Sequence, residues 1–320
     1  MKVGLIDVDG HNFPNIPLMK LSAWHKSRGD SVEWYSPMFS GHLDKVYMSK
    51  VFSFTPDYEY PIDADVIEKG GSGYAIRLVD GKEVYDKSQD KNLPDEIEHI
   101  YPDYSLYPDL CADTAYGFLT RGCPRGCEFC HVAKKEGRCS IKVADLSEFW
   151  RGQKNIMLCD PNILACREHM DLLQQLVDSK ARVNFNQGLD IRLINDRNLA
   201  LLRQIRLDGI HLAFDRWQDK DIIEPKLRAF HEAGFTKDRG RVSVYILCNF
   251  DTTLEQDLYR IQLCRELRFN PYPMIYDKEH CDPIYRKLQR WCSNTIFWKC
   301  PTFEEYKAKE RGGTNAEILL

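Results

Sequence analysis

Three cysteines within one short stretch are the feature of this sequence with the clearest chemistry. The stretch RGCPRGCEFC places Cys123, Cys127 and Cys130 at spacings of four and then three. Thiolates bind metals, and three of them can occupy three corners of a cuboidal [4Fe–4S] cluster while the fourth iron stays open. Structural zinc takes four ligands instead, and His131 and Cys139 are the nearby candidates for a fourth. The spacing therefore favours an iron–sulfur cluster over a zinc site.

The elements that must position these cysteines alternate regularly between strand and helix. Strands are expected at 115–122, 155–160, 182–187, 209–215, 241–250 and 270–277, and helices at 143–152, 163–179, 195–206, 220–235 and 253–269. Such alternation predicts βαβ units in a parallel sheet, and six strands are too few for the closed eight-stranded TIM barrel. We therefore predict an open, partial (β/α)6 TIM-like barrel over residues 111–276, followed by a C-terminal extension over 277–320.

The cysteine stretch follows the first predicted strand of this barrel. In barrels of this kind, the chemistry lies in the loops at the carboxyl ends of the strands. We therefore expect the functional site at that end of the sheet.

Residues 1–110 predict a separate α/β domain. Short apolar runs at 2–8, 31–35, 45–52 and 64–71 surround an amphipathic segment that ends in glycine, which is an incomplete Rossmann-like, doubly wound pattern. The following residues, up to Pro108, are rich in charged residues, proline and tyrosine and lack sustained periodicity, as expected of a linker that wraps around the domain. We place the boundary between the domains near residue 110.

Composition limits the class of protein. The chain has 320 residues, of which 43% are hydrophobic, and no apolar run approaches the roughly 20 residues that cross a bilayer. Neither a membrane partner nor a signal peptide is expected, and twelve cysteines in a long chain of this kind indicate a reducing, cytoplasmic location. Charge is uneven, at −8 over residues 1–110 and +4 over 111–320. This asymmetry is either ordinary surface or a sign that the second part receives an anionic substrate or cofactor.

The cysteine motif CPRGCEFC has the form CxxxCxΦC, with Phe129 in the aromatic position, and resembles the signature of the radical S-adenosylmethionine (radical SAM) superfamily. The resemblance covers about residues 112–276. It implies that the three cysteines bind a [4Fe–4S] cluster and that SAM chelates the open iron. It also implies that one electron, from a reducing partner such as flavodoxin or ferredoxin, cleaves SAM to a 5′-deoxyadenosyl radical, which abstracts hydrogen from an unidentified substrate. The alternative from another class is a non-enzymatic zinc scaffold whose barrel binds a partner.

The resemblance also suggests residues that contact SAM. After the second strand the turn LCDPNIL stands where the family contacts the SAM amino group, so Asp160 and Asn162 are candidates; a plain turn with a helix N-cap is the alternative.

The third and fourth strands supply further SAM candidates. Gln187, Asp190 and Arg192 follow the third strand, and Arg192 could grip the SAM carboxylate through two hydrogen bonds or form a surface ion pair. Asp215 follows the fourth strand, where related enzymes carry an acidic residue near the ribose.

The N-terminal domain resembles the cobalamin (B12)-binding domain of B12-type radical SAM enzymes, which would add methyl transfer to the outcomes. His11 lies in a DGHNFP stretch similar to the family's DxHxxG motif, with proline in place of the last glycine. Gly70 and Gly71 resemble the glycines beside the nucleotide tail of the cofactor, since glycine lets a backbone approach a ligand closely. The alternatives are an ordinary turn and a domain that has kept the fold and lost the ligand.

Two further classes of site are not supported. Cys281, Cys292 and Cys300 are spaced by eleven and eight, unlike auxiliary-cluster motifs, and are read as core or surface thiols. No segment of the sequence supplies the aromatic stacking platform or dense basic stripe of a dedicated nucleic-acid binder.

Overall fold

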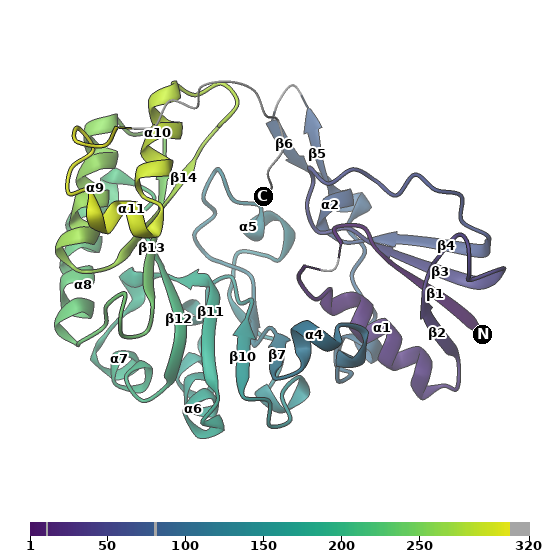
Figure 1. Cartoon of the computed structure of the whole chain (residues 1–320). Coiled ribbons are helices and arrows are strands. Elements are labelled where there is room, and N and C mark those ends of the chain that lie inside the picture. Colours follow the sequence, from purple (N-terminus) through teal and green to yellow (C-terminus); the bar gives the residue numbers. More distant parts are fainter. Residues whose placement is uncertain (11, 80–81, 308–320) are drawn as a thin grey trace. The chain divides into compact units, whose positions relative to one another are not determined.

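The computed structural model describes residues 1–10, 12–79 and 82–307 (Figure 1). Contacts between residues divide the chain into two compact units, Met1–Ile210 and His211–Leu320, and each is described by itself. None of the helices in the described ranges has both the length and the apolar character needed to cross a membrane.

The first unit begins with a parallel sheet of four strands in the order β2-β1-β3-β4. The strands are β1 (Lys2–Asp7), β2 (Ser31–Trp34), β3 (Leu43–Ser49) and β4 (Ala64–Gly70). Helix α1 (Ile16–Ser27) lies along one face of this sheet (Figure 1), and Asn15 caps it by accepting a hydrogen bond from the backbone N–H of Leu18.

Side chains of β1 alternate between the two faces of the sheet. Val3 and Leu5 pack with α1, whereas Ile6 packs on the opposite face with Tyr58 and Ile62 of the loop between β3 and β4. That second face is thus covered by a loop where a complete doubly wound domain has a helix.

The core under α1 continues into the first barrel strands. Tyr107, Tyr116 and Cys159 belong to the same buried cluster as Val3 and Leu5. The segment between the two sheets contains three short α-helices and one hairpin: α2 (Ser72–Ala75), β5 (Ile76–Val79), β6 (Lys82–Tyr85), α3 (Asp95–Glu98) and α4 (Pro108–Cys111). The predicted boundary near residue 110 stays a prediction.

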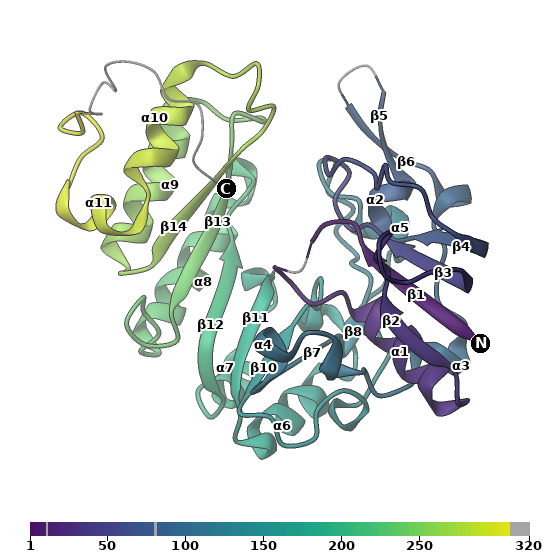
Figure 2. The same cartoon turned by 45° about the vertical axis from the view of Figure 1, so that its right-hand side comes forward.

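A second sheet has six parallel strands in the order β14-β13-β12-β11-β10-β7. The strands are β7 (Thr114–Gly117), β10 (Asn155–Leu158), β11 (Arg182–Leu189), β12 (Arg206–Ala213), β13 (Val242–Cys248) and β14 (Asn270–Ile275). Figure 2 shows β10, β11 and β12 side by side. The predicted fold class, a Rossmann-like domain followed by a partial (β/α)6 barrel, is confirmed.

Four helices connect successive strands of this sheet, namely α6 (His169–Ser179), α7 (Asp196–Leu202), α8 (Lys220–Glu232) and α9 (Leu254–Glu266). The chain continues through α10 (Pro283–Trp291) and α11 (Asn294–Lys299). Thr253 caps α9 through a capping box with Gln256, as its sequence pattern would suggest.

The helix predicted at 143–152 is wrong. This segment holds only a short 3-10 turn at Leu146–Glu148, and it follows a small hairpin of β8 (Thr120–Arg121) and β9 (Ile141–Lys142). The backbone N–H groups of Val143 and Ala144 donate to the carbonyl of Leu119, at 2.8 and 3.3 Å. These bonds hold the start of the segment extended beside β8, and the backbone is still extended at Asp145, which precedes the 3-10 turn.

Candidate cofactor site

The three cysteines lie in the loop between β8 and α5 (Val132–Lys135). Cys123, Cys127 and Cys130 are all partly exposed, and all are reduced. The Cys130 N–H donates to the carbonyl of Cys127 at 3.0 Å, which makes a tight turn between the last two thiols. Gly122 begins the loop at a φ of +85°, and a Cβ there would lie 2.1 Å from the carbonyl oxygen of Cys139. Only glycine permits this start of the loop.

Glu136 ties down the beginning of the loop. Its carboxylate accepts hydrogen bonds from Arg121 Nη1 at 3.0 Å and from the Gly122 N–H at 3.1 Å. The Arg121 guanidinium also lies over the ring of Phe118, 3.5 Å from its centroid, where a cation–π contact adds to the attachment. Glu136 was not a sequence candidate, because no motif marks a residue that binds a loop backbone fourteen positions earlier.

Asp160 anchors the strand that enters the loop. Its side chain, 4% exposed, accepts hydrogen bonds from the Leu119 N–H at 3.1 Å, from the Thr120 N–H and from Thr120 Oγ1 at 2.7 Å. Burial raises the pKa of this carboxyl to about 6, although the bonds from Thr120 and Leu119 act in the opposite direction. The contact of Asp160 with the SAM amino group stays a prediction, whereas the three bonds that its buried carboxylate accepts give it an anchoring role.

Asn162 lies beside the first cysteine. Its Nδ2 is 3.5 Å from Cys123 Sγ, and its backbone carbonyl accepts a bond from Ser140 Oγ at 2.9 Å. Its Oδ1 is buried and has no hydrogen-bond partner in the described part of the chain. An amide oxygen left in this state costs about 1–3 kcal/mol, so it is suited to accept a bond from a ligand N–H. The contact of Asn162 with the SAM amino group stays a prediction.

Asp190 joins the cysteine loop to the end of β11. Its carboxylate, 6% exposed, accepts from Arg192 Nε at 2.7 Å and from Arg125 Nε. Burial alone would raise the pKa of Asp190, but the hydrogen bonds and charges of Arg192 and Arg125 outweigh it and hold that pKa below its ordinary value. Arg125 stands between the first two cysteines, so this ion pair holds the loop by its middle.

The predicted pairing of Arg192 with the SAM carboxylate stays a prediction, and the structure shows the ion-pair alternative instead. Arg192 and Asp190 are joined by two side-chain hydrogen bonds, from Nε and Nη2. Gln187 is exposed on β11, and Phe129 is half-buried within the loop. Sequence reasoning missed Arg125, because nothing in the motif distinguishes it from a solvated charge.

In the second unit, Asp215 accepts a hydrogen bond from the Leu247 N–H at 3.1 Å. Arg260, fully buried, donates to the carbonyls of Asp215 and Leu247 at 2.9 and 2.8 Å and pairs with the buried Asp257. The ends of β12 and β13 are thereby fixed to α9. Asp215 is held at the carboxyl end of its strand, as predicted; its contact with the ribose stays a prediction.

Of the residues predicted to bind cobalamin, Gly71 packs closely against the backbone of its own domain. His11 lies outside the described residues. Asp9, two positions earlier, accepts bonds from the backbone N–H groups of Val51 and Phe52. Gly71 has a φ of +98°, and a Cβ there would lie 2.3 Å from the carbonyl oxygen of Lys50. At Gly70 a Cβ would meet only ordinary contacts at 3.9 Å. Close packing against Lys50 thus accounts for the glycine at position 71.

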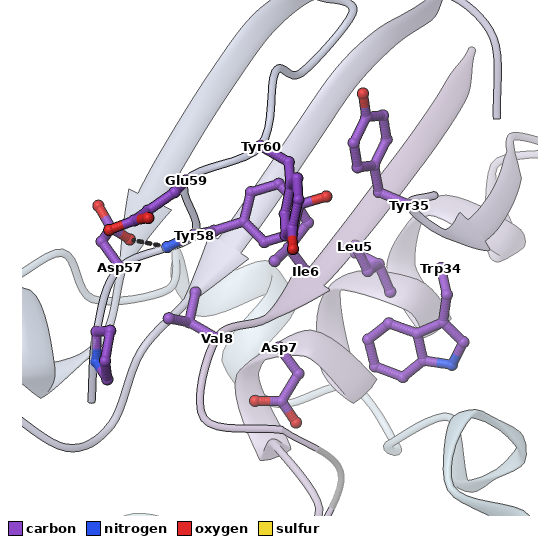
Figure 3. Close-up of a pocket in the computed structure, with 11 residues that line it drawn as sticks. Leu5, Ile6, Asp7, Val8, Trp34, Tyr35, Asp57, Tyr58, Glu59 and Tyr60 are labelled. Carbon is purple, nitrogen blue, oxygen red and sulfur yellow. Dashed lines mark hydrogen bonds between the residues drawn. The ribbon is translucent and has the colours of Figure 1, made fainter. Parts of the chain in front are cut away.

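A cavity of about 590 Å³ opens at the carboxyl ends of β1 and β2. Figure 3 shows its aromatic and acidic walls, which are formed by Trp34, Tyr35, Tyr58, Tyr60, Asp7, Asp57 and Glu59. Asp7 accepts a bond from the Tyr107 hydroxyl at 2.7 Å, and Asp57 pairs with Lys69 at 2.7 Å. Neither Gly70 nor Gly71 is among the described residues that line it.

The three C-terminal cysteines differ in how far they are exposed to solvent. Cys292 is buried, and burial raises its pKa, whereas Cys281 and Cys300 are partly exposed. Across the described ranges, no three side chains of His, Cys, Asp or Glu gather closely enough to hold a single metal ion. The reading of these residues as core or surface thiols stays a prediction.

The fold places the chain among known structures. It is similar to the fold of TsrM, a radical SAM methyltransferase. Two solved structures of TsrM from Kitasatospora setae share it, one with cobalamin and [4Fe–4S] cluster bound and one with tryptophan substrate and the SAM analogue aza-SAM bound. Each has a TM-score of 0.59 and 12% identity, over 86% of this chain and 72% of TsrM. No family's sequence model and no curated protein matches the chain.

Proposed function

We propose that this chain is a radical SAM enzyme that holds a [4Fe–4S] cluster on Cys123, Cys127 and Cys130. The observation that carries the proposal is the position of these thiols. All three belong to one loop after the first barrel strand, in a chain whose fold is similar to that of TsrM, which was solved with such a cluster bound.

The residues around the loop fit this cofactor and SAM. Three thiols supply the ligands of three irons, and the unpartnered Oδ1 of Asn162 beside Cys123 can accept a hydrogen bond from the SAM amino group. When bound, the cluster and SAM together supply one-electron reductive cleavage of SAM to a 5′-deoxyadenosyl radical, with the electron coming from a partner such as flavodoxin or ferredoxin.

The chain's own contribution is to hold the loop still. Glu136, Asp160 and Asp190 each accept hydrogen bonds from residues between Leu119 and Arg125. These carboxylates follow three different elements, α5, β10 and β11, so the loop is attached at three separate points. Preorganisation of this kind keeps bound SAM in one orientation relative to the thiols.

The zinc scaffold has less support from the geometry. Of the two candidates for a fourth ligand, His131 directs Nε2 to Glu83 at 3.1 Å, and Cys139 is exposed with its carbonyl packed against Gly122. The buried Nδ1 of His131 has no partner among the described residues. His131→Ala therefore separates the two candidates, since it would remove metal from a zinc site and leave a three-cysteine cluster intact.

The test is metal and product analysis of anaerobically reconstituted protein. About four irons and four sulfides per chain are expected, with slow release of 5′-deoxyadenosine from SAM under reduction and loss of both in the Cys123→Ala/Cys127→Ala/Cys130→Ala variant. One zinc per chain, or unchanged iron in the triple variant, would contradict the proposal. A reducible cluster that released no 5′-deoxyadenosine with any reductant would contradict its enzymatic part.

Cobalamin enters the proposal only through the fold. TsrM was solved with cobalamin bound. Here, however, the backbone of Lys50 occupies the space beside Gly71, and the Asp9 carboxylate accepts hydrogen bonds from the N–H groups of Val51 and Phe52. The proposed reaction therefore ends at hydrogen abstraction from an unidentified substrate. Titration with cobalamin tests the addition of methyl transfer: a base-off spectrum that changes in His11→Ala would establish ligation by that residue, and no binding at micromolar concentration would remove methyl transfer.

A further inference from the structure

A second cavity lies at the amino ends of the barrel strands, at the opposite edge of the sheet from the cysteine loop. It has a volume of about 570 Å³. Its walls come from the segments that lead into β10, β11 and β12, namely Trp150, Gly152, Gln153, Lys154, Asn155, Ser179, Lys180, Ala181, Arg182 and Arg206. All of these residues belong to the first unit.

Four of the lining side chains are cationic, although the whole chain has a net charge of −4. Lys154 pairs with Asp113 at 2.8 Å, and Arg182 lies 4.0 Å from Asp208. Lys180 and Arg206 have no carboxylate partner in the described part of the chain. The two acids therefore offset only half of the positive charge, and the cavity attracts anions.

Backbone contacts fix the arrangement of these cations. The Arg182 N–H donates to the carbonyl of Lys154 at 2.8 Å, and Arg206 Nη1 donates to the carbonyl of Lys180 at 3.1 Å. Lys180 ends α6 in the left-handed region, at a φ of 57°. Glycine or asparagine usually occupies this position, because a Cβ is strained there. A lysine thus occupies a position where the backbone favours glycine, and this lysine lines the cavity.

The other lining groups narrow the class of anion. Trp150 contributes an indole ring whose orientation is set by a hydrogen bond from Nε1 to the carbonyl of Gln153 at 2.8 Å. Gln153 and Asn155 add amide side chains that can both donate and accept. Guanidinium groups match the oxygens of a phosphate, and indole rings stack on nucleobases.

We propose that this cavity binds the phosphate of a nucleotide, with its base against Trp150. Arg206 and Lys180 contact the phosphate, and a volume of about 570 Å³ accommodates one nucleotide unit. The same chemistry is presented by a free nucleotide and by one unit of an RNA strand. The inference goes beyond the proposed function, because it needs neither the cluster nor SAM at this cavity.

The test uses the full, cluster-reconstituted chain and pyrimidine probes, which do not resemble the adenosine of SAM. Calorimetry with UMP, uridine and inorganic phosphate is expected to rank UMP first. The Lys180→Glu/Arg206→Glu variant should weaken UMP binding by about tenfold or more, the equivalent of one lost charge-assisted contact. The matched control Lys87→Glu/Lys91→Glu makes the same charge change on exposed residues outside the cavity and should stay within about twofold.

Lys180→Gly keeps the test valid if the double variant does not fold. Glycine relieves the left-handed strain at this position, so the midpoint of urea unfolding should rise while UMP binding falls by about threefold or more. UMP that bound no tighter than uridine, equal weakening in the control, or unchanged affinity in both cavity variants would overturn the proposal. Fluorescence anisotropy with a labelled oligouridylate then distinguishes an RNA strand from a free nucleotide as the ligand. An affinity well above that for UMP, with a steep salt dependence, indicates an RNA strand, and an affinity equal to that for UMP indicates the free nucleotide.

Discussion

Replacing Asp160 with asparagine tests whether this buried carboxylate anchors the cysteine loop. The two side chains have nearly the same shape, and one oxygen can still accept from the Thr120 N–H and Oγ1. The second oxygen, 3.2 Å from the Leu119 N–H, becomes an N–H₂ group that cannot accept. The Leu119 N–H keeps its bond to Oδ1 at 3.1 Å, but the new N–H₂ group faces this N–H inside the protein. A buried donor that meets another donor costs about 1–3 kcal/mol, and we expect opening of the 119–120 segment to become easier by that amount.

The same substitution should change how the stability of the segment depends on pH. The pKa of Asp160 is raised from 3.8 to about 6 by burial, so the folded chain favours the protonated form. The stability that comes from this protonation is fully present below pH 3.8 and is lost as the pH rises through 6. Linkage gives a loss of about 1 kcal/mol between pH 5 and pH 7.5 for the wild type and none for the variant. The difference between the two proteins should therefore shrink as pH rises.

Hydrogen exchange of the Leu119 and Thr120 amides measures both effects. Rates at pH 5 and pH 7.5, corrected for intrinsic exchange, give the opening free energy of each protein. Asp178→Asn is the matched control, because this exposed residue of α6 accepts one bond from Gln174. Unchanged protection in Asp160→Asn would refute the anchoring role, and a difference that grew with pH would refute the raised pKa.

Three further predictions concern the framework of the site. Asp190→Ala should lower the free energy of unfolding in urea by about 1–3 kcal/mol, since it removes the acceptor of the Arg125 and Arg192 Nε–H groups. The pKa of Asp190 is depressed, so its stabilisation is present above pH 3.8 and should disappear as pH falls below that value. Gly71→Ala should lower the free energy of unfolding by about 2 kcal/mol or more, because its Cβ would meet Lys50. Gly29 also has a positive φ but has open space around it, so Gly29→Ala should lower this free energy by about 1 kcal/mol. Equal unfolding midpoints of the two variants would contradict the close approach to Lys50. Arg260→Met should lower the thermal midpoint and make the Leu247 amide exchange faster, because Asp257 is then buried without its cationic partner. A rise in the midpoint would show that the desolvation cost of the Arg260–Asp257 pair exceeds its attraction.

Local patterns in the sequence were sufficient for the order of the elements. The six strands of the second sheet were all predicted, because each is a short apolar run between helical segments, and that signal needs no distant partner. Four of the five predicted barrel helices are formed, for the same reason. The fifth, predicted at 143–152, is only a 3-10 turn, since bonds from Val143 and Ala144 to the carbonyl of Leu119, more than twenty residues earlier, hold the start of the segment extended.

The cysteine motif was equally readable, because three ligands at fixed short spacing can meet one cofactor without help from the rest of the chain. The roles of the residues around it were not readable. Asp160 and Arg192 were expected to meet SAM, and the structure shows them bonded to Thr120 and Asp190. A carboxylate beside a predicted ligand site has the same sequence signal whether it faces the ligand or anchors a loop.

Tertiary structure alone decided which charges lie together. Arg125 reaches Asp190 over 65 positions, and Lys154, Lys180, Arg182 and Arg206 line one cavity although no basic stripe is visible in the sequence. Parallel strands bring the starts of successive βα units to one edge of a sheet, so residues about 25 positions apart become neighbours. Electrostatic sites depend on distances in space, and a linear pattern determines those distances only within a single helix, strand or turn.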